Sequence, residues 1–463
     1  MTRLTVALDR RFVLKGLIAA PAATAIAGIA PRRALAQTRP DAILLSVADL
    51  HSPYARLPQL LAEVRAIVAE AEASVALVIN GDLFERGNVV ATRSRGVADL
   101  AALRALCREL PVVLNLGNHE TAILDDMAQA VAEATAAGAQ VIGNLIDRRT
   151  GRFFAPVSAR LGLGGMDIAL LGVGTDNPFV YREPARDTLT LLDPAGFTAE
   201  AFGDVTGGAD LPVLVSHAGV MHDRAILPTL AANALVIGAH DHLDFIHQEA
   251  GQTYLHGGAW ARELAVLHLN RTGDGVSVTP QMRAIGTSGG DAALAEMIAG
   301  VEAEHLTDAD RAVIAERGSA LDLPASILLA TEAVRTATDA DLAVLGHTTF
   351  GAPLDAGALR RYDFDAFIRF DGELTVAEVP GDVLATILTR ANQHRAASLD
   401  RRTGDFIHAA EIDIDPARTY RLATNGWTAM NQQSYLGTAD LEFATAEGLM
   451  LKAVVADALA GGL

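Results

Sequence analysis

The segment 111–120 reads Pro-Val-Val-Leu-Asn-Leu-Gly-Asn-His-Glu. Its first half is apolar and β-branched and has the length of a strand. Gly117 then allows the backbone to turn sharply and to approach whatever the next side chains bind. Asn118 and His119 therefore follow the carboxyl end of a predicted strand, which is where α/β sheets place their ligands.

Strand-like runs precede Asp or His at four other points in the first 245 residues. These runs are 42–48, 75–80, 211–216 and 234–239, and they end in Asp49 and His51, in Asp82, in His217, and in His240 and His242. Amphipathic helical segments separate the first three strands, and this βαβ alternation predicts a parallel sheet. Side chains of ligand type would then gather at one edge of that sheet.

The collected residues offer carboxylate, imidazole and amide groups, which suit manganese, zinc or iron. We expect two divalent metal ions, with Asp82 bridging them, Asp49, His51 and His242 completing one site, and Asn118, His217 and His240 completing the other. Two cations about 3.5–4 Å apart hold a phosphoryl oxygen and align a bridging hydroxide for attack on phosphorus. This chemistry needs no nucleophilic side chain.

Five motifs resemble those of the calcineurin-like metallophosphoesterase superfamily. They are Asp-Leu-His at 49–51, Gly-Asp-x-x-x-Arg-Gly at 81–87, Gly-Asn-His-Glu at 117–120, Ser-His at 216–217 and Gly-x-His-x-His at 238–242. They occur in the family's order, each at a predicted strand end, so the resemblance is specific. It implies a four-layer α/β/β/α sandwich and a metal-dependent hydrolase that acts on phosphoric esters.

The same resemblance assigns a role to His119. In the family this histidine stands near the leaving-group oxygen, as general acid or transition-state stabiliser. It needs a carboxylate partner to fix its tautomer. In the 5′-nucleotidase branch this partner is an Asp three residues after the histidine, where this chain has Ala122. In the protein serine/threonine phosphatase branch it is an acidic residue three positions after the bridging Asp, which here is Glu85. We predict a Glu85–His119 dyad with Arg86 as a phosphate contact, the alternative being a surface ion pair of Glu85 with Arg86.

The C-terminal third resembles the substrate domain of 5′-nucleotidases, which implies a smaller α+β domain. The matching stretches are 339–345, 373–381 and 415–425. The substrate loops differ, since 346–351 reads Gly-His-Thr-Thr-Phe-Gly and lacks the family's arginine, while 431–435 reads Asn-Gln-Gln-Ser-Tyr. His347, Phe350 and Tyr435 are the candidate substrate contacts, and a core role is the alternative for the two aromatic residues.

These patterns divide the chain into four segments. We predict a signal peptide at 1–36, a metallophosphoesterase domain at 38–285, a linker helix region at 286–318 and a 5′-nucleotidase-like C-terminal domain at 319–463. An Ala/Glu-rich run predicts one helix over 292–317, and further helices are expected at 326–339 and 381–393. Two strands at 253–256 and 263–269 are expected to pair antiparallel.

The N-terminus resembles a twin-arginine export signal. Asp-Arg-Arg-Phe-Val-Leu-Lys at 9–15 precedes a weakly apolar run over 17–30 and an Ala-Leu-Ala cleavage site at 34–36. This run is too short and too rich in Ala and Gly for a convincing membrane span. We therefore expect export through the twin-arginine translocation machinery to the periplasm, with an uncleaved anchor or an ordinary helix as the alternative.

The charge narrows the range of partners. The formal net charge is −19, which argues against nucleic acid and anionic membrane surfaces. Cys107 is the only cysteine, so no intramolecular disulfide forms.

The predicted function is exported, dimetal-dependent hydrolysis of a small-molecule phosphate ester, most like a 5′-nucleotidase. Two alternatives remain open. One is a thiosulfohydrolase of sulfur oxidation, because those enzymes share this fold and act on a group held by a partner protein. The other is a non-catalytic binding protein that kept the metal scaffold.

Overall fold

The computed structural model describes residues 39–273, 275–395 and 398–462. The predicted signal peptide at 1–36 lies outside these residues. Within the described ranges, none of the helices combines the length and the apolar character needed to cross a membrane.

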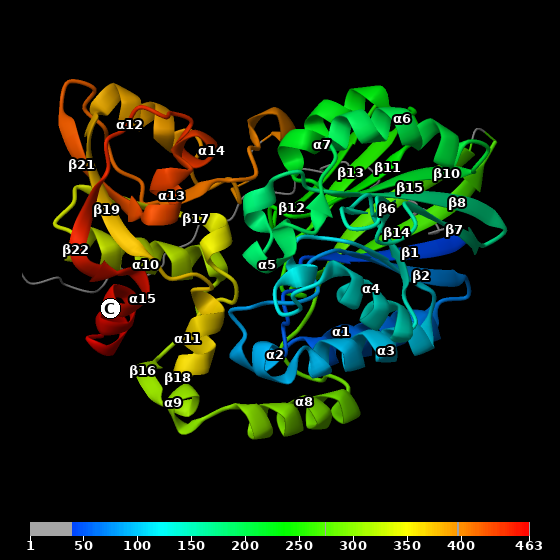
Figure 1. Ribbon diagram of the computed structural model, residues 1–463, viewed down its shortest axis with the longest axis horizontal. Helices are drawn as coiled ribbons and strands as arrows, with labels where there is room; N and C mark the ends of the chain where they lie inside the picture. Colours follow the sequence, from blue (N-terminus) through cyan, green and yellow to red (C-terminus); the bar gives the residue numbers. More distant parts are fainter. Residues whose placement is uncertain (1–38, 274, 396–397, 463) are drawn as a thin grey trace, which may run out of the picture. The chain divides into compact units, whose positions relative to one another are not determined.

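A first six-stranded sheet carries the predicted βαβ units. Its order is β15-β14-β1-β2-β3-β4, formed by Gly275–Ala284, Glu263–Thr272, Ala42–Ala48, Ser74–Asn80, Val112–Asn115 and Gln140–Ile142. β1 to β4 run parallel, while β14 and β15 are antiparallel to their neighbours. Its outer face packs on α1 (Leu57–Glu70), α3 (Val97–Glu109) and α4 (Met127–Ala136), and α8 (Ala292–His305) lies against α1 and α3, as Figure 1 shows.

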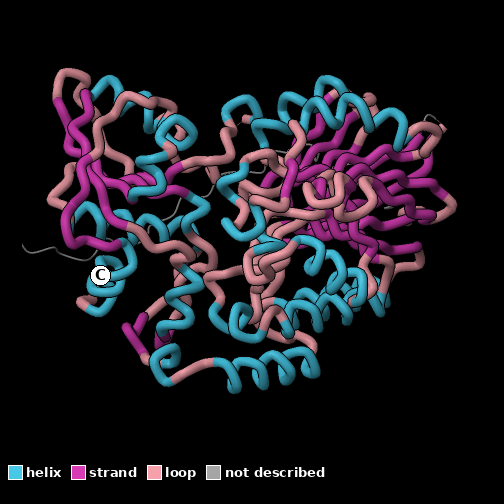
Figure 2. The backbone as a smooth tube through the Cα atoms, viewed as in Figure 1, coloured by secondary structure: helices cyan, strands magenta, loops and turns pink. Residues whose placement is uncertain are grey.

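A second six-stranded sheet packs face to face with the first. Its order is β12-β13-β11-β10-β8-β7, formed by Asp244–Glu249, Gln252–Gly257, Leu235–Gly238, Leu211–His217, Met166–Gly174 and Ser158–Leu163. The inner faces of both sheets share one aliphatic core, and α6 (Pro194–Thr206) with α7 (Val220–Ile226) covers the outer face of the second sheet. Figure 2 shows these strands between two helical layers. The predicted four-layer sandwich is confirmed.

The C-terminal residues form a smaller α+β region with its own two cores. Its five-stranded sheet has the order β20-β17-β21-β19-β22, formed by Ile407–Ala409, Leu342–Gly346, Thr419–Asn425, Glu373–Pro380 and Ala444–Met450. β16 (Val313–Arg317) and β18 (Gly357–Arg360) make a separate two-stranded sheet. The helices are α10 (Leu323–Ala337), α11 (Arg361–Phe367), α12 (Gly381–Leu388), α13 (Gly426–Met430), α14 (Gln432–Leu436) and α15 (Leu451–Ala460).

Two local predictions were wrong. The strands at 253–256 and 263–269 do not pair with each other, because β13 pairs with β11 and β12 whereas β14 pairs with β1 and β15. Left-handed backbone at Gly258, Trp260 and Ala261 carries the chain from one sheet to the other. The helix expected over 292–317 ends at His305, because Thr307 caps a new short helix, α9 (Asp308–Arg311), before β16 begins.

The prediction that Phe350 and Tyr435 contact substrate also needs correction. Phe350 is 1% exposed and packs on Phe367 in one core of the C-terminal region. Tyr435 is 2% exposed, lies in the other core and shares hydrogen bonds with Thr348 and Trp427. Both side chains hold the region together, so neither presents a face on which a substrate could stack.

Replacing Phe350 by Ala should therefore act on stability. Removing a fully buried Phe costs about 3–5 kcal/mol of unfolding free energy, because the apolar contacts are lost and a cavity remains. Urea denaturation would measure the loss, and Trp427→Ala, at an exposed position, should cost far less. A loss below about 1 kcal/mol in Phe350→Ala would contradict the core assignment.

Candidate metal centre

The predicted ligands lie together at the carboxyl ends of β1, β2, β3, β10 and β11. Five of them hold left-handed backbone, with φ between +49° and +82°: Asp49, His51, Asp82, His240 and His242. Such φ values are costly for residues other than glycine and cluster at functional sites. Only glycine fits at position 117, because a Cβ there would lie 2.3 Å from an Asp82 oxygen. The glycine of the Gly-Asn-His motif thus lets the β3 loop approach Asp82.

The candidate ligand atoms form two groups, and Asp82 lies where they meet. Asp49, His51 and His242 form one group, and Asp82, His217 and His240 form another, with the ligand atoms of each group within 4.8 Å of one another. Asp82 faces both groups, since its Oδ2 lies 3.6 Å from His51 Nε2 and its Oδ1 lies 3.2 Å from His217 Nε2. This is the arrangement expected of a bridging carboxylate.

The hydrogen bonds show that these atoms fit metal ions. His217 Nδ1 lies 2.9 Å from the carbonyl oxygen of Asn80, so Nδ1 must donate, and Nε2 is the ring nitrogen that faces Asp82. Asn118 Oδ1 and His217 Nε2 are buried without a hydrogen-bond partner among the described residues. His51 Nε2 and His242 Nε2 face each other at 2.9 Å. Lone pairs and carboxylate oxygens that converge in this way are matched by cations.

Two family models match the chain. The calcineurin-like phosphoesterase model matches residues 44–244, and the model of the 5′-nucleotidase C-terminal domain matches residues 325–439. Together they cover more than half of the chain, in the order of the two regions described above. The chain belongs to the calcineurin-like metallophosphoesterases that carry a 5′-nucleotidase C-terminal domain.

Individual relatives of this metallophosphoesterase are distant. The uncharacterized metallophosphoesterase YunD of Bacillus subtilis (strain 168) is 27% identical over 201 residues, and the match spans 42% of this chain and 42% of that protein. The 5′-nucleotidase precursor of Thermus thermophilus has a TM-score of 0.61 at 17% identity, over 90% of this chain and 96% of its own. The sulfate thiohydrolase SoxB of the same species has a TM-score of 0.62 at 15% identity, over 91% of this chain and 94% of its own. The 5′-nucleotidase of Candida albicans SC5314 has a TM-score of 0.59 at 14% identity, over 92% of this chain and 99% of its own. These likenesses establish the fold.

Burial and neighbouring charge set the protonation of the centre. Burial raises the pKa of Asp49 well above its ordinary value, although the nearby His217 opposes this shift. Burial alone would lower the pKa of His217, but the carboxylates of Asp82 and Asp49 raise it to about 10. Burial lowers the pKa of His51 to about 4, and the guanidinium of Arg369 adds to the shift. The buried charges therefore depend strongly on one another.

Glu85 lies at the centre of a larger cluster than the predicted dyad. It is fully buried, which excludes the surface ion pair. Its Oε2 lies 3.7 Å from His119 Nδ1 but only 3.3 Å from His51 Nδ1 and 2.7 Å from Arg369 Nε. Burial raises the pKa of Glu85, but Arg369 and His119 together bring it below the ordinary value.

The guanidinium beside His119 belongs to Arg369, not to Arg86 as the motif at 81–87 predicted. Arg86 is exposed. Arg369 follows α11, is buried, and places Nη2 3.3 Å from His51 Nδ1 and 3.4 Å from His119 Nε2. Its Nη1 donates to the carbonyl oxygen of Thr348, and the ring of Phe370 packs on the guanidinium at 4.9 Å. No local motif marks Arg369, because its contacts with Glu85 join residues far apart in sequence.

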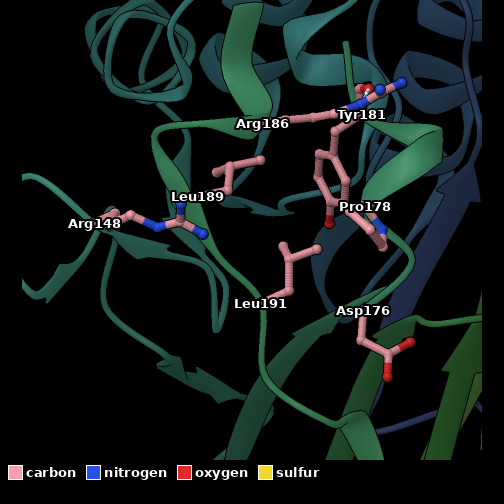
Figure 3. Close-up of a pocket in the computed structure, with 7 residues that line it drawn as sticks. All are labelled: Arg148, Asp176, Pro178, Tyr181, Arg186, Leu189 and Leu191. Atoms are coloured by element: carbon pink, nitrogen blue, oxygen red, sulfur yellow. Dashed lines mark hydrogen bonds between the residues drawn. The ribbon is translucent and has the colours of Figure 1, made fainter. Parts of the chain in front are cut away.

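The loop after β8 borders Asn118. Asn118 Nδ2 donates to the carbonyl oxygen of Val180, and the neighbouring Tyr181 is buried. A pocket of about 220 Å³ lies beside this loop. Figure 3 shows the residues that line it: Arg148, Asp176, Pro178, Tyr181, Arg186, Leu189 and Leu191. None of the predicted site residues lines this pocket.

Removal of metal should destabilise this metallophosphoesterase. A ligand that binds only the folded state adds about 2.7 kcal/mol at a hundredfold excess over its Kd. Protein stripped with chelator should therefore melt several degrees lower than protein reloaded with manganese, as measured by calorimetry. In Asp82→Asn most of this difference should vanish. Identical melting curves for stripped and reloaded wild-type protein would contradict the metal assignment.

Proposed function

We propose that this protein is a dimetal-dependent hydrolase of phosphoric esters. The observation that carries the proposal is the position of Asp82, whose two carboxylate oxygens face two separate groups of buried ligand atoms. Asp49, His51 and His242 would hold one ion, and Asn118, His217 and His240 the other. When bound, two such cations supply Lewis-acid stabilisation of the phosphoryl oxygens and activate water.

The side chains beside the proposed ions handle charge and protons. His119 is the partly exposed member of the cluster, with 15% of its side chain accessible. It would assist the leaving-group oxygen from its Nε2 side, while Glu85 faces Nδ1. Arg369, whose Nη2 lies close to the same His119 Nε2, would contact the anionic substrate in the role first expected of Arg86.

For the substrate, the match of residues 325–439 to the 5′-nucleotidase C-terminal domain supports a nucleotide-like phosphomonoester. A second candidate is favoured by the burial of Phe350 and Tyr435, which leaves the two predicted stacking residues inside the cores. This candidate is a thiosulfohydrolase-like reaction on a sulfur group held by a partner protein. Manganese, zinc or iron as the metal, and twin-arginine export to the periplasm, belong to the same proposal and rest on the sequence.

A substrate panel tests the proposal. The chain from residue 37 onward, reloaded with manganese, would be assayed with 5′-AMP, a 2′,3′-cyclic nucleotide, a UDP-sugar and an aryl phosphate diester. Release of phosphate from 5′-AMP that chelator abolishes is the expected result. Turnover of the aryl ester alone would support the dimetal hydrolase and reject the nucleotide assignment. No turnover by protein that holds both ions would reject this substrate class and support a partner-held substrate or a binding protein.

Arg369 and Arg86 provide a matched pair of variants. Arg369→Gln should lower kcat/KM by about 10- to 100-fold, because a charge-assisted hydrogen bond is worth about 1.5–3 kcal/mol. Arg86→Gln removes an equal charge from an exposed position and should change kcat/KM by less than about threefold. Steady-state kinetics on the best substrate of the panel would compare them. The reverse ranking would restore the original prediction for Arg86.

A further inference from the structure

Asn118 is the candidate ligand whose side chain has two chemically different ends. Its neighbours in the chain both contact Asp82, since a Cβ at Gly117 would lie 2.3 Å from an Asp82 oxygen and His119 N donates to Asp82 Oδ1 at 2.7 Å. Asn118 is 3% exposed, and its Oδ1 is buried without a hydrogen-bond partner among the described residues. A cation can bind only this oxygen, because the amide nitrogen is a donor and offers no lone pair.

The other end of the amide is bonded to Val180. Asn118 Nδ2 donates to the carbonyl oxygen of Val180 at 3.3 Å. A carbonyl oxygen only accepts, so a flipped amide would place its own oxygen against this carbonyl. Val180 therefore decides which end of the Asn118 amide is left free, and that end is the oxygen.

Val180 is the last residue of a short 3₁₀ turn whose consecutive carbonyl oxygens are shared between two side chains. Arg186 donates from Nε to the carbonyl oxygen of Tyr181 at 2.8 Å and from Nη2 to the carbonyl oxygen of Phe179 at 3.1 Å. The carbonyl between these two is that of Val180, which accepts from Asn118. One guanidinium thus holds the residues on either side of the carbonyl that orients the ligand.

Two further bonds close the loop that carries this turn. Tyr181 is 1% exposed, and its hydroxyl donates to the carbonyl oxygen of Thr175 at 2.9 Å. Asn177 Oδ1 accepts from Phe179 N at 3.0 Å and caps the start of the turn. The turn is therefore held by side chains, and neither Tyr181 nor Arg186 is itself a candidate ligand.

We propose that Arg186 and Tyr181 are positioning residues for the metal centre. They hold the turn whose Val180 carbonyl fixes the amide of Asn118, so that the amide oxygen is the end left for a cation. They thereby set the affinity of the ion that Asn118 helps to bind and leave the affinity of the other ion unchanged. The inference rests on the metal centre of the proposed function.

Manganese binding tests this role without recourse to activity. The chain would be stripped of metal and titrated with manganese alone, with calorimetry reporting the two affinities and elemental analysis the stoichiometry. Arg186→Met keeps an unbranched side chain but removes both bonds to the turn. It should weaken one of the two sites about 10- to 100-fold, the usual effect of losing a group that supports a metal ligand. The other site should bind as in the wild type.

Two further variants complete the comparison. Tyr181→Phe removes one hydroxyl from the same loop and should weaken the same site about 3- to 10-fold, the effect of one ordinary hydrogen bond. It covers the case in which Arg186→Met does not fold. Arg148→Met is the matched control, because Arg148 lines the pocket beside this loop from an exposed position, so that an equal charge is removed. It should bind both ions as the wild type does.

A double-mutant cycle separates the amide from general packing. Asn118→Asp keeps a ligand oxygen but has no N–H group to donate to Val180. Arg186→Met should therefore cost less than about threefold in affinity when it is added to Asn118→Asp, although it costs about tenfold or more in the wild-type background.

Wild-type affinities at both sites in Arg186→Met and in Tyr181→Phe would overturn the positioning role. Equal weakening by Arg148→Met would overturn it as well, because the effect would then be one of charge. An undiminished loss in the Asn118→Asp background would do the same, because the effect would not pass through the amide. Fewer than two ions in the wild-type protein would overturn the proposed metal centre itself, a failure that is visible before any variant is compared.

Discussion

The burial of two carboxylates side by side is the constraint on which the rest of the structure depends. Asp49 is 0% exposed and Asp82 is 1% exposed, and both lie among imidazole nitrogens. Desolvated like charges are costly unless cations or donors compensate them. The backbone of the neighbouring loops supplies part of the compensation, because His240 N donates to Asp49 and His119 N donates to Asp82. The remaining lone pairs are the basis for the metal assignment.

Buried amide side chains hold the two sheets of the sandwich together beneath this cluster. Asn80 at the end of β2 donates to the carbonyl oxygens of Ser216 and Ile237 in the other sheet. Asn115 at the end of β3 donates to Asn80 and to Val173 and Val215. These buried amides tie the carboxyl ends of the two sheets together beneath the ligands. The strained φ values of the ligand residues are sustained by this frame.

The sandwich does not complete the cluster by itself. Glu85 is shared between His51, His119 and Arg369, and Arg369 comes from the C-terminal region. His347 reaches the loop of His242 from the same region. The C-terminal residues therefore act on the centre through an ion pair on one side and through aromatic packing on the other.

The sequence predicted which candidate ligands lie together because each position depends on local information. A β-branched run followed by Asp, Asn or His identifies a strand end, and parallel strands bring their carboxyl ends to one edge. Arg369 could not be predicted in this way, because its contacts join distant segments and follow no periodicity. Phe350 and Tyr435 were misassigned for a related reason: aromatic residues in a loop motif do not reveal whether the loop packs inward. The pairing of β13 and β14 failed because a five-residue connection that usually makes a hairpin here changes sheets.

The most direct test of the dimetal centre is anomalous X-ray diffraction from crystals of the protein grown with manganese, recorded at the manganese edge. A dimetal centre should give two anomalous peaks about 3.5–4 Å apart, with the Asp82 carboxylate between them. A single peak, or none, with Asp82 still facing both groups of histidines would contradict it.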